Sequence, residues 1–120
     1  MSASALNVYS YSRCSTCKKA LKWLDSNKLT YNLIDIVDQP PSKEILRKAY
    51  FQLGNRRLLF NTSGQSYRLL GASVVKAMSD EESLDALASD GKLIKRPFLV
   101  YEESQILAGF KPEVWSAALL

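Results

Sequence analysis

The sequence predicts an α/β fold in which a mixed β-sheet is flanked by helices. Over residues 5–37 the pattern is strand, helix, strand; residues 41–91 are rich in helical patterns; residues 97–120 indicate a hairpin and then a helix. Two parallel strands joined by a helix form a right-handed βαβ unit, and the hairpin adds antiparallel pairing. A chain of 120 residues suffices for one domain and is short for two. We therefore expect a single domain over residues 1–120, with a helical insert at about 41–91.

The N-terminal unit is recognised by a change of hydrophobic period. Residues 5–11 are β-prone. The next apolar residues have the spacing i, i+3, i+4 and i+7 of an amphipathic helix, and they are Cys17, Ala20, Leu21 and Leu24. Asn27 and Lys28 suit the end of this helix, so residues 29–37 form the second strand.

The middle of the chain carries helix start and stop signals. Ser42 is a suitable N-cap, and Gly54 ends the helix that follows it. Ser79 with Glu82 forms a capping box for a later helix, and Gly91 follows the last turn of that helix. We therefore expect two well-bounded helices in the insert.

The remaining segments are shorter. Residues 58–71 indicate a polar loop and a short helix. Residues 97–110 alternate as a hairpin with its turn near 102–104. The end of the chain indicates a helix with Pro112 in its first turn.

Composition limits the classes of function. Apolar runs are too short to span a bilayer, and the N-terminus lacks the basic and apolar regions of a signal peptide. The net charge of +4 comes from basic residues spread along the chain, which favours a solvated basic surface over nucleic-acid binding. We expect a cytoplasmic protein without direct nucleic-acid or membrane contact.

The chain has two cysteines, Cys14 and Cys17, and no histidine. In a reducing compartment such a close pair is more often catalytic, redox-sensing or metal-binding than a structural disulfide. Without histidine or a second CxxC, the ligands of a structural zinc site are missing, and we expect no metal. Cys-His dyads and Ser-His-Asp triads are excluded for the same reason.

Cys14 lies at the predicted strand-to-helix turn, about where the helix N-cap would be. Unpaired backbone N–H groups and the helix dipole favour a thiolate there, and Arg13, Lys18 and Lys19 add positive charge. Cys17 lies on the apolar stripe one turn later. It is either a partner thiol for Cys14 or a small core residue.

Five stretches, taken in order, resemble one known family. They are YSRCSTCKKALKWL, PPSKEIL, LFNTSGQSYRLLG, DGKLIKRPFLV and LAGFKPEVW. Together they resemble the arsenate-reductase-like branch of the thioredoxin fold, which includes glutaredoxin-coupled arsenate reductases and Spx-type transcription regulators. The resemblance covers nearly the whole chain and implies a thioredoxin-like fold.

The resemblance also implies roles. Cys14 matches the nucleophile that attacks arsenate, after which glutathione completes a mixed disulfide and glutaredoxin recycles the enzyme. Arg96 supplies electrostatic support, and its bond to Pro97 is expected to be cis. Substrate binding is expected from Arg13, Ser15, Thr16, Pro97 and Lys111. No bound cofactor is expected; glutathione with glutaredoxin, or thioredoxin, is the expected electron donor.

Two departures bear on the substrate. The reductases surround the nucleophile with three arginines, and here Phe60 stands at the first position, Arg96 at the second and Lys111 at the third. Phenylalanine cannot donate to an oxyanion and lysine lacks the bidentate fork, which argues against efficient arsenate reduction. Arg56 and Arg57, one turn away, are candidate replacements. The second departure is Cys17, because the CxxC pair belongs to the regulators.

Three hypotheses follow. The first is a thiol-dependent reductase or thiol–disulfide oxidoreductase in which Cys17 resolves a mixed disulfide on Cys14, acting on a small oxyanion or on a glutathione-bound or protein thiol. The alternative is an Spx-like regulator that binds the RNA polymerase α subunit and uses the pair as a redox switch. The third is a catalytically silent relative. The Asn-Thr-Ser-Gly loop at residues 61–64 favours the reductase.

Overall fold

A four-stranded mixed sheet organises the protein. The computed structural model describes residues 6–120, and the strand order is β2-β1-β3-β4. The strands are β1 (Leu6–Ser10), β2 (Tyr31–Asp35), β3 (Phe98–Tyr101) and β4 (Gln105–Ala108). β1 pairs in parallel with β2 and antiparallel with β3, which pairs antiparallel with β4. The predicted βαβ unit, hairpin and mixed sheet are confirmed.

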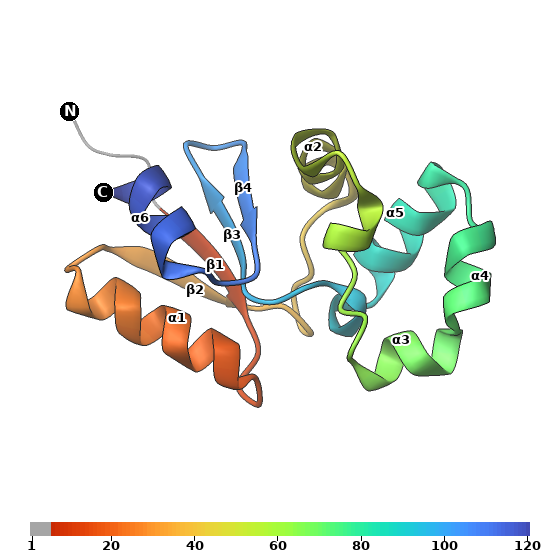
Figure 1. The fold of residues 1–120 in the computed structure, drawn as a ribbon, viewed down its shortest axis with the longest axis horizontal. Helices are drawn as coiled ribbons and strands as arrows, with labels where there is room; N and C mark the ends of the chain where they lie inside the picture. The colour runs from red at the N-terminus through yellow and green to blue at the C-terminus, as the bar shows by residue number, and fades with distance from the viewer. Residues whose placement is uncertain (1–5) are drawn as a thin grey trace.

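The helices form two groups (Figure 1). Their bounds are α1 (Ser15–Ser26), α2 (Lys43–Leu53), α3 (Gln65–Leu70), α4 (Ala72–Ala77), α5 (Asp80–Ser89) and α6 (Pro112–Leu119), with 3-10 turns η1 (Arg56–Leu58) and η2 (Gly91–Leu93). α1 and α6 lie with the sheet, whereas α2 to α5 form a separate helical group between β2 and β3 in the chain. In residues 6–120 we find no helix with the length and apolar character that a membrane span requires.

Each face of the sheet has its own core, because successive side chains of a strand point to opposite faces. Leu99 of β3 packs with Leu24 of α1 and Trp115 of α6. Its neighbours Phe98 and Val100 belong to the other cluster, which includes buried residues of α2 and α5. The helical insert is therefore anchored on one face of the sheet, and the βαβ helix on the other.

The caps of the insert follow the predictions. Ser42 Oγ accepts from Ile45 N at 3.2 Å, and the capping box at Ser79 is present. Asp90 is the C-cap of α5, and Gly91 follows the last turn as expected and begins η2. Glycine is needed there for packing: a Cβ would lie 1.8 Å from the carbonyl oxygen of Ile36.

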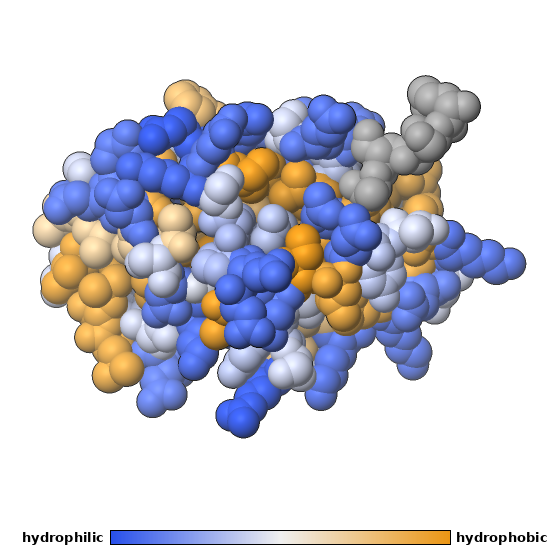
Figure 2. Space-filling view, turned by 180° about the vertical axis from the view of Figure 1, so that it is seen from behind, coloured by the Kyte–Doolittle hydropathy of each residue, from blue (hydrophilic) through white to orange (hydrophobic). Residues whose placement is uncertain are grey.

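The edge strand β4 is hydrogen-bonded to the helical insert. At β4 the Gln52 side chain from α2 accepts from Ile106 N at 2.9 Å and donates to the carbonyl of Ser104. The insert thereby covers backbone groups of an edge strand. On the face seen in Figure 2, apolar patches lie among polar residues, both at the left end of the view and across its middle. Leu69 of α3 and Val74 of α4 are exposed.

Candidate active site

Cys14 is the N-cap of α1, as predicted. The turn after β1 is closed by a hydrogen bond from Cys14 N to Tyr11 O at 3.0 Å, and Cys14 has extended backbone angles. Its Sγ accepts from Cys17 N at 3.2 Å. The sulfur is thus held against the N-terminal turn of the helix, where backbone N–H groups and the dipole stabilise negative charge.

Cys17 lies beneath Cys14 and is only 1% exposed. Burial, followed by hydrogen bonding with Cys14, raises the pKa of Cys17 to about 11, against weaker lowering contributions from Tyr11 and Ser10. Both cysteines are free thiols. Cys17 therefore packs in the core and also lies within reach of the Cys14 sulfur.

A pocket of about 490 Å³ opens at Cys14. Three other parts of the chain complete it: the loop after Leu59, the segment before β3 and the β4–α6 connection. It is lined by Arg13, Cys14, Ser15, Thr16, Asn61, Ser63, Gly64, Lys95, Arg96, Ala108, Gly109, Phe110 and Lys111. Every charged residue in this lining is basic, so the pocket favours anionic ligands.

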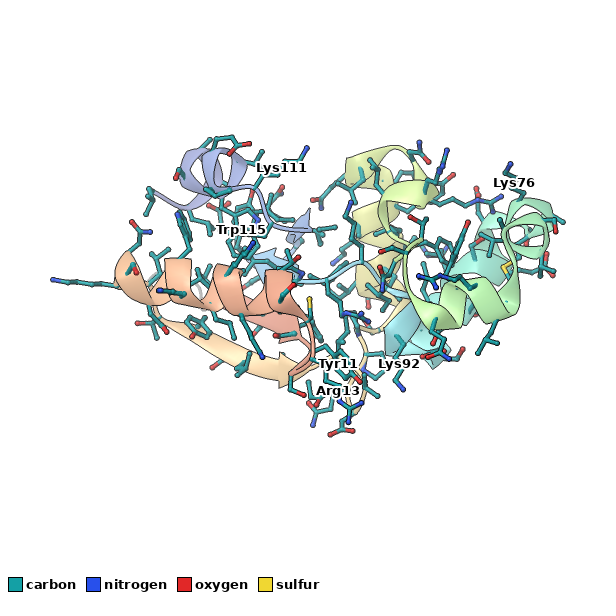
Figure 3. The ribbon with its side chains drawn as sticks, turned by 60° about the horizontal axis from the view of Figure 1, so that its bottom comes forward. Tyr11, Arg13, Lys76, Lys92, Lys111 and Trp115 are labelled. Carbon is teal, nitrogen blue, oxygen red and sulfur yellow. The ribbon has the colours of Figure 1, made fainter. Side chains whose placement is uncertain are left out.

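A second polar pocket, of about 390 Å³, shares part of this wall. Arg13, Asn61, Gly64 and Arg96 line both hollows. Figure 3 shows Tyr11 and Arg13 beside Lys92 at the junction of the sheet and the helical insert, with Lys111 at the start of α6. The cationic site is therefore larger than a compact oxyanion needs.

Arg96 lies at this junction with its guanidinium 5.0 Å from the centre of the Tyr11 ring. Nη1 donates to Lys92 O at 3.3 Å. Nε is buried, and within residues 6–120 it has no hydrogen-bond partner. The bond from Arg96 to Pro97 is cis, as the resemblance implied.

The structure brings most of the predicted site residues together. The pocket lining contains Arg13, Cys14, Ser15, Thr16, Arg96 and Lys111. Pro97 is fully buried behind the wall instead of lining it, and its carbonyl accepts from Gly109 N at 2.8 Å. Pro97 thus fixes the β4–α6 connection, which differs from the direct substrate contact expected from the sequence.

Phe60 and its neighbouring arginines do not enter the pocket. Phe60 is 2% exposed and packs in the core. Arg56 is directed to the helical insert, where Nη1 donates to Met78 O at 2.6 Å and to Ser83 Oγ at 2.8 Å. Neither Arg56 nor Arg57 is in the lining, so the expectation that one of them replaces the missing arginine is wrong.

Sequence reasoning missed the other lining residues, namely Asn61, Ser63, Gly64, Lys95, Ala108, Gly109 and Phe110. The signal available was the Asn-Thr-Ser-Gly loop. Asn61 Oδ1 accepts from Ser63 Oγ at 3.3 Å. A Cβ on Gly64 would lie 2.5 Å from Asn61 Nδ2, so the glycine leaves room for this amide. Asn61 presents a neutral donor next to the buried Phe60.

Comparisons with known proteins agree on one family. The model of the ArsC family matches residues 9–118. The chain is 44% identical over 111 residues to the uncharacterized protein YusI of Bacillus subtilis strain 168, covering 91% of this chain and 93% of that protein. It is 28% identical over 109 residues to the regulatory protein MgsR of the same strain, covering 89% of this chain and 84% of that one.

A solved structure supports the same assignment. It is described as a possible arsenate reductase from Streptococcus mutans UA159, with 40% identity, a TM-score of 0.85, and coverage of 94% of this chain and 98% of that one. The thioredoxin-like fold predicted from the resemblance is confirmed by this likeness.

Proposed function

The chain belongs to the ArsC family, and from this premise we propose that it is a thiol-dependent reductase or thiol–disulfide oxidoreductase with Cys14 as its nucleophile. One observation carries the proposal: Cys14 Sγ rests on the first turn of α1 in a pocket whose charged lining is all basic. Thiolate attack needs a stabilised anion and access to substrate. This position supplies both.

In the proposed reaction the Cys14 thiolate attacks a substrate disulfide. A new S–S bond forms to Cys14, the old one breaks, and the leaving sulfur departs as a thiolate. The cations Arg13, Arg96 and Lys111 line the pocket and are suited to an anionic substrate. No bound cofactor is required.

Two routes can resolve the mixed disulfide. Cys17 can attack Cys14 Sγ, which releases the substrate thiol and leaves a Cys14–Cys17 disulfide. An external thiol can perform the same step. Because the pKa of Cys17 is raised to about 11, little Cys17 is thiolate at neutral pH, and the external route is favoured. Glutathione with glutaredoxin, or thioredoxin, is the proposed donor, and the cytoplasm is the proposed location.

The substrate class follows from the wall of the pocket. The first arginine position of the reductases is the buried Phe60, and the third is Lys111. With Arg96 as the only one of the three matched positions that keeps a bidentate fork, a compact tetrahedral oxyanion is held less well. We therefore place disulfide substrates ahead of arsenate, although the name of the S. mutans relative makes arsenate worth assaying.

The test is turnover of glutathione mixed disulfides, coupled to NADPH oxidation through glutathione reductase. Wild type is expected to be active and Cys14→Ser inactive. Cys17→Ser is the matched control, and it should retain activity when glutathione is the resolving thiol. Absence of turnover with mixed disulfides, insulin and arsenate alike would remove the enzyme hypothesis.

A second candidate is a redox-switched regulator that binds the RNA polymerase α subunit. Similarity to the regulatory protein MgsR and the CxxC spacing favour it. Retention of the purified α subunit on the immobilised protein, with the cysteine pair reduced and oxidised, tests it. No retention in either state would rule this candidate out.

A further inference from the structure

An apolar groove opens beside the Cys14 pocket. It has a volume of about 210 Å³ and lies between α2 with η1 on one side and β4 with α6 on the other. Its apolar walls come from Leu53, Leu58, Leu107, Val114 and Trp115. Both hollows are lined by Lys95, Ala108, Gly109 and Lys111. The groove is therefore an extension of the site and shares one wall with it.

The mouth of this groove combines apolar surface with positive charge. Leu58 is 42% exposed and Val114 is 45% exposed, although they come from distant parts of the chain. Lys95 and Lys111 are the charged residues of the lining, and it contains no carboxylate among the described residues. A Cβ on Gly109 would lie 2.9 Å from Lys95 Cε, so the lysine stem lies close over this glycine at the shared wall.

These features fit one kind of ligand. A small oxyanion or a simple thiol leaves the groove empty, whereas a polypeptide can fill both hollows at once. An apolar side chain gains free energy from entering the groove, and a nearby carboxylate is attracted by the two lysines. We infer that the groove binds an apolar side chain of an acidic polypeptide whose cysteine reacts with Cys14.

This inference rests on the proposed function and narrows its substrate class to protein disulfides. The reacting cysteine occupies the Cys14 pocket, and an apolar residue near it in sequence occupies the groove. Cys14 attacks the peptide sulfur, the existing S–S bond breaks, and its other thiol leaves as a thiolate. No other oxidant or reductant takes part in this step.

The test uses peptides whose single cysteine is a mixed disulfide with nitrothiobenzoate, whose release is followed by absorbance. One peptide carries leucine and glutamate near the cysteine, with the leucine moved through the positions on either side. In matched peptides serine replaces leucine, or glutamine replaces glutamate. We expect the best leucine position to react about tenfold faster than its serine partner, and the glutamate peptide to react severalfold faster than the glutamine one.

Variants of the protein locate the effect. Leu58→Gln and Val114→Gln are expected to remove most of the leucine preference, measured as the ratio of the leucine-peptide rate to the serine-peptide rate. Phe51→Gln is the matched control, because Phe51 is 81% exposed and lies outside the groove. It should keep the preference. Glutamine adds no charge, so attraction of the acidic peptide is not altered.

The outcomes separate this inference from the proposed function. A mixed disulfide of nitrothiobenzoate and 2-mercaptoethanol reports Cys14 reactivity alone; if it reacts no faster with wild type than with Cys14→Ser, the proposed function fails. If it reacts with wild type but leucine and serine peptides have equal rates, the groove inference is overturned. It is also overturned if sedimentation finds a dimer that Val114→Gln dissociates, since a second copy would then occupy the groove.

Discussion

Cys14 and Cys17 are separated by one helical turn, yet their environments are opposite. Cys14 lines the pocket, while Cys17 is buried below it with its pKa raised to about 11. The sequence left Cys17 open between a partner thiol and a core residue. The CxxC spacing alone could not decide between these two roles, because one position on the apolar face of α1 both buries Cys17 in the core and places its thiol next to Cys14.

The first prediction concerns the pH dependence of resolution by Cys17. The thiolate is the attacking form, and at pH values below the raised pKa its fraction grows about tenfold per pH unit. A mixed disulfide preformed on Cys14 should therefore release its thiol faster as pH rises into the alkaline range, because burial, the largest cause of the raised pKa of Cys17, does not depend on the Cys14 thiol. Stopped-flow absorbance of released nitrothiobenzoate measures this. Cys17→Ser should lose the release, and a rate independent of pH would contradict the buried-thiol account.

A second prediction at the residue scale concerns Gly64. Its φ of −83° suits alanine, but the added Cβ would lie 2.5 Å from Asn61 Nδ2 and displace that amide. Because Asn61 lines the pocket, Gly64→Ala should lower the rate of Cys14 with an anionic mixed disulfide about two- to tenfold, the value of one hydrogen bond.

A double-mutant cycle separates this effect from general disturbance. Asn61→Ala and the double variant Asn61→Ala, Gly64→Ala should have the same rate, because the glycine acts through the asparagine. Additive losses would show that Gly64 acts by another path.

At the scale of elements, local signals predicted what local physics determines. Ser42 and the capping box at Ser79 begin their helices as expected, and the hairpin turn lies at Glu102 and Glu103, both with positive φ. Gly91 follows α5 as expected, but the reason that a glycine is needed there is tertiary, because the carbonyl of Ile36 leaves no room for a Cβ. No pattern within a few residues of Gly91 reveals that contact.

This contact gives a stability prediction. In Gly91→Ala the Cβ would meet the carbonyl oxygen of Ile36 at 1.8 Å, so η2 must move away from the segment that follows β2. We expect the free energy of unfolding to fall by about 3 kcal/mol, at the upper range for overpacking. Gly54→Ala is the comparison, since its φ is +72° but a Cβ there meets nothing within 4 Å; its cost should be about 1 kcal/mol. Urea denaturation measures both, and equal losses would contradict the packing account.

At the scale of the whole molecule, the lining of the site comes both from the sheet with its connections and from the loop at residues 61–64 of the helical insert. Cys14 and Arg13 could be predicted because they adjoin a recognisable strand-to-helix turn. Asn61 and Lys95 could not, since they reach the pocket through a loop and through the segment before β3, and only the folded chain brings them to Cys14. The buried Phe60 illustrates the same limit. Its alignment with the first arginine position shows that residue 60 offers no hydrogen-bond donor, but it does not show that the next residue, Asn61, lines the pocket.

The charge of the assembled pocket gives the last prediction. Its charged residues, Arg13, Lys95, Arg96 and Lys111, are all basic, and the whole chain carries +4. Attraction of an anionic substrate over such distances is screened by salt, since the Debye length falls from about 10 Å at 0.1 M to about 3 Å at 1 M. The rate of Cys14 with a glutathione mixed disulfide should therefore fall severalfold over this range, while that with a neutral hydroxyethyl disulfide stays nearly constant.

Lys111→Gln should weaken the salt dependence without abolishing reaction of the neutral reagent. Parallel salt profiles for the two reagents would mean that the basic lining does not select the substrate, and the preference for anionic disulfides would have to be given up.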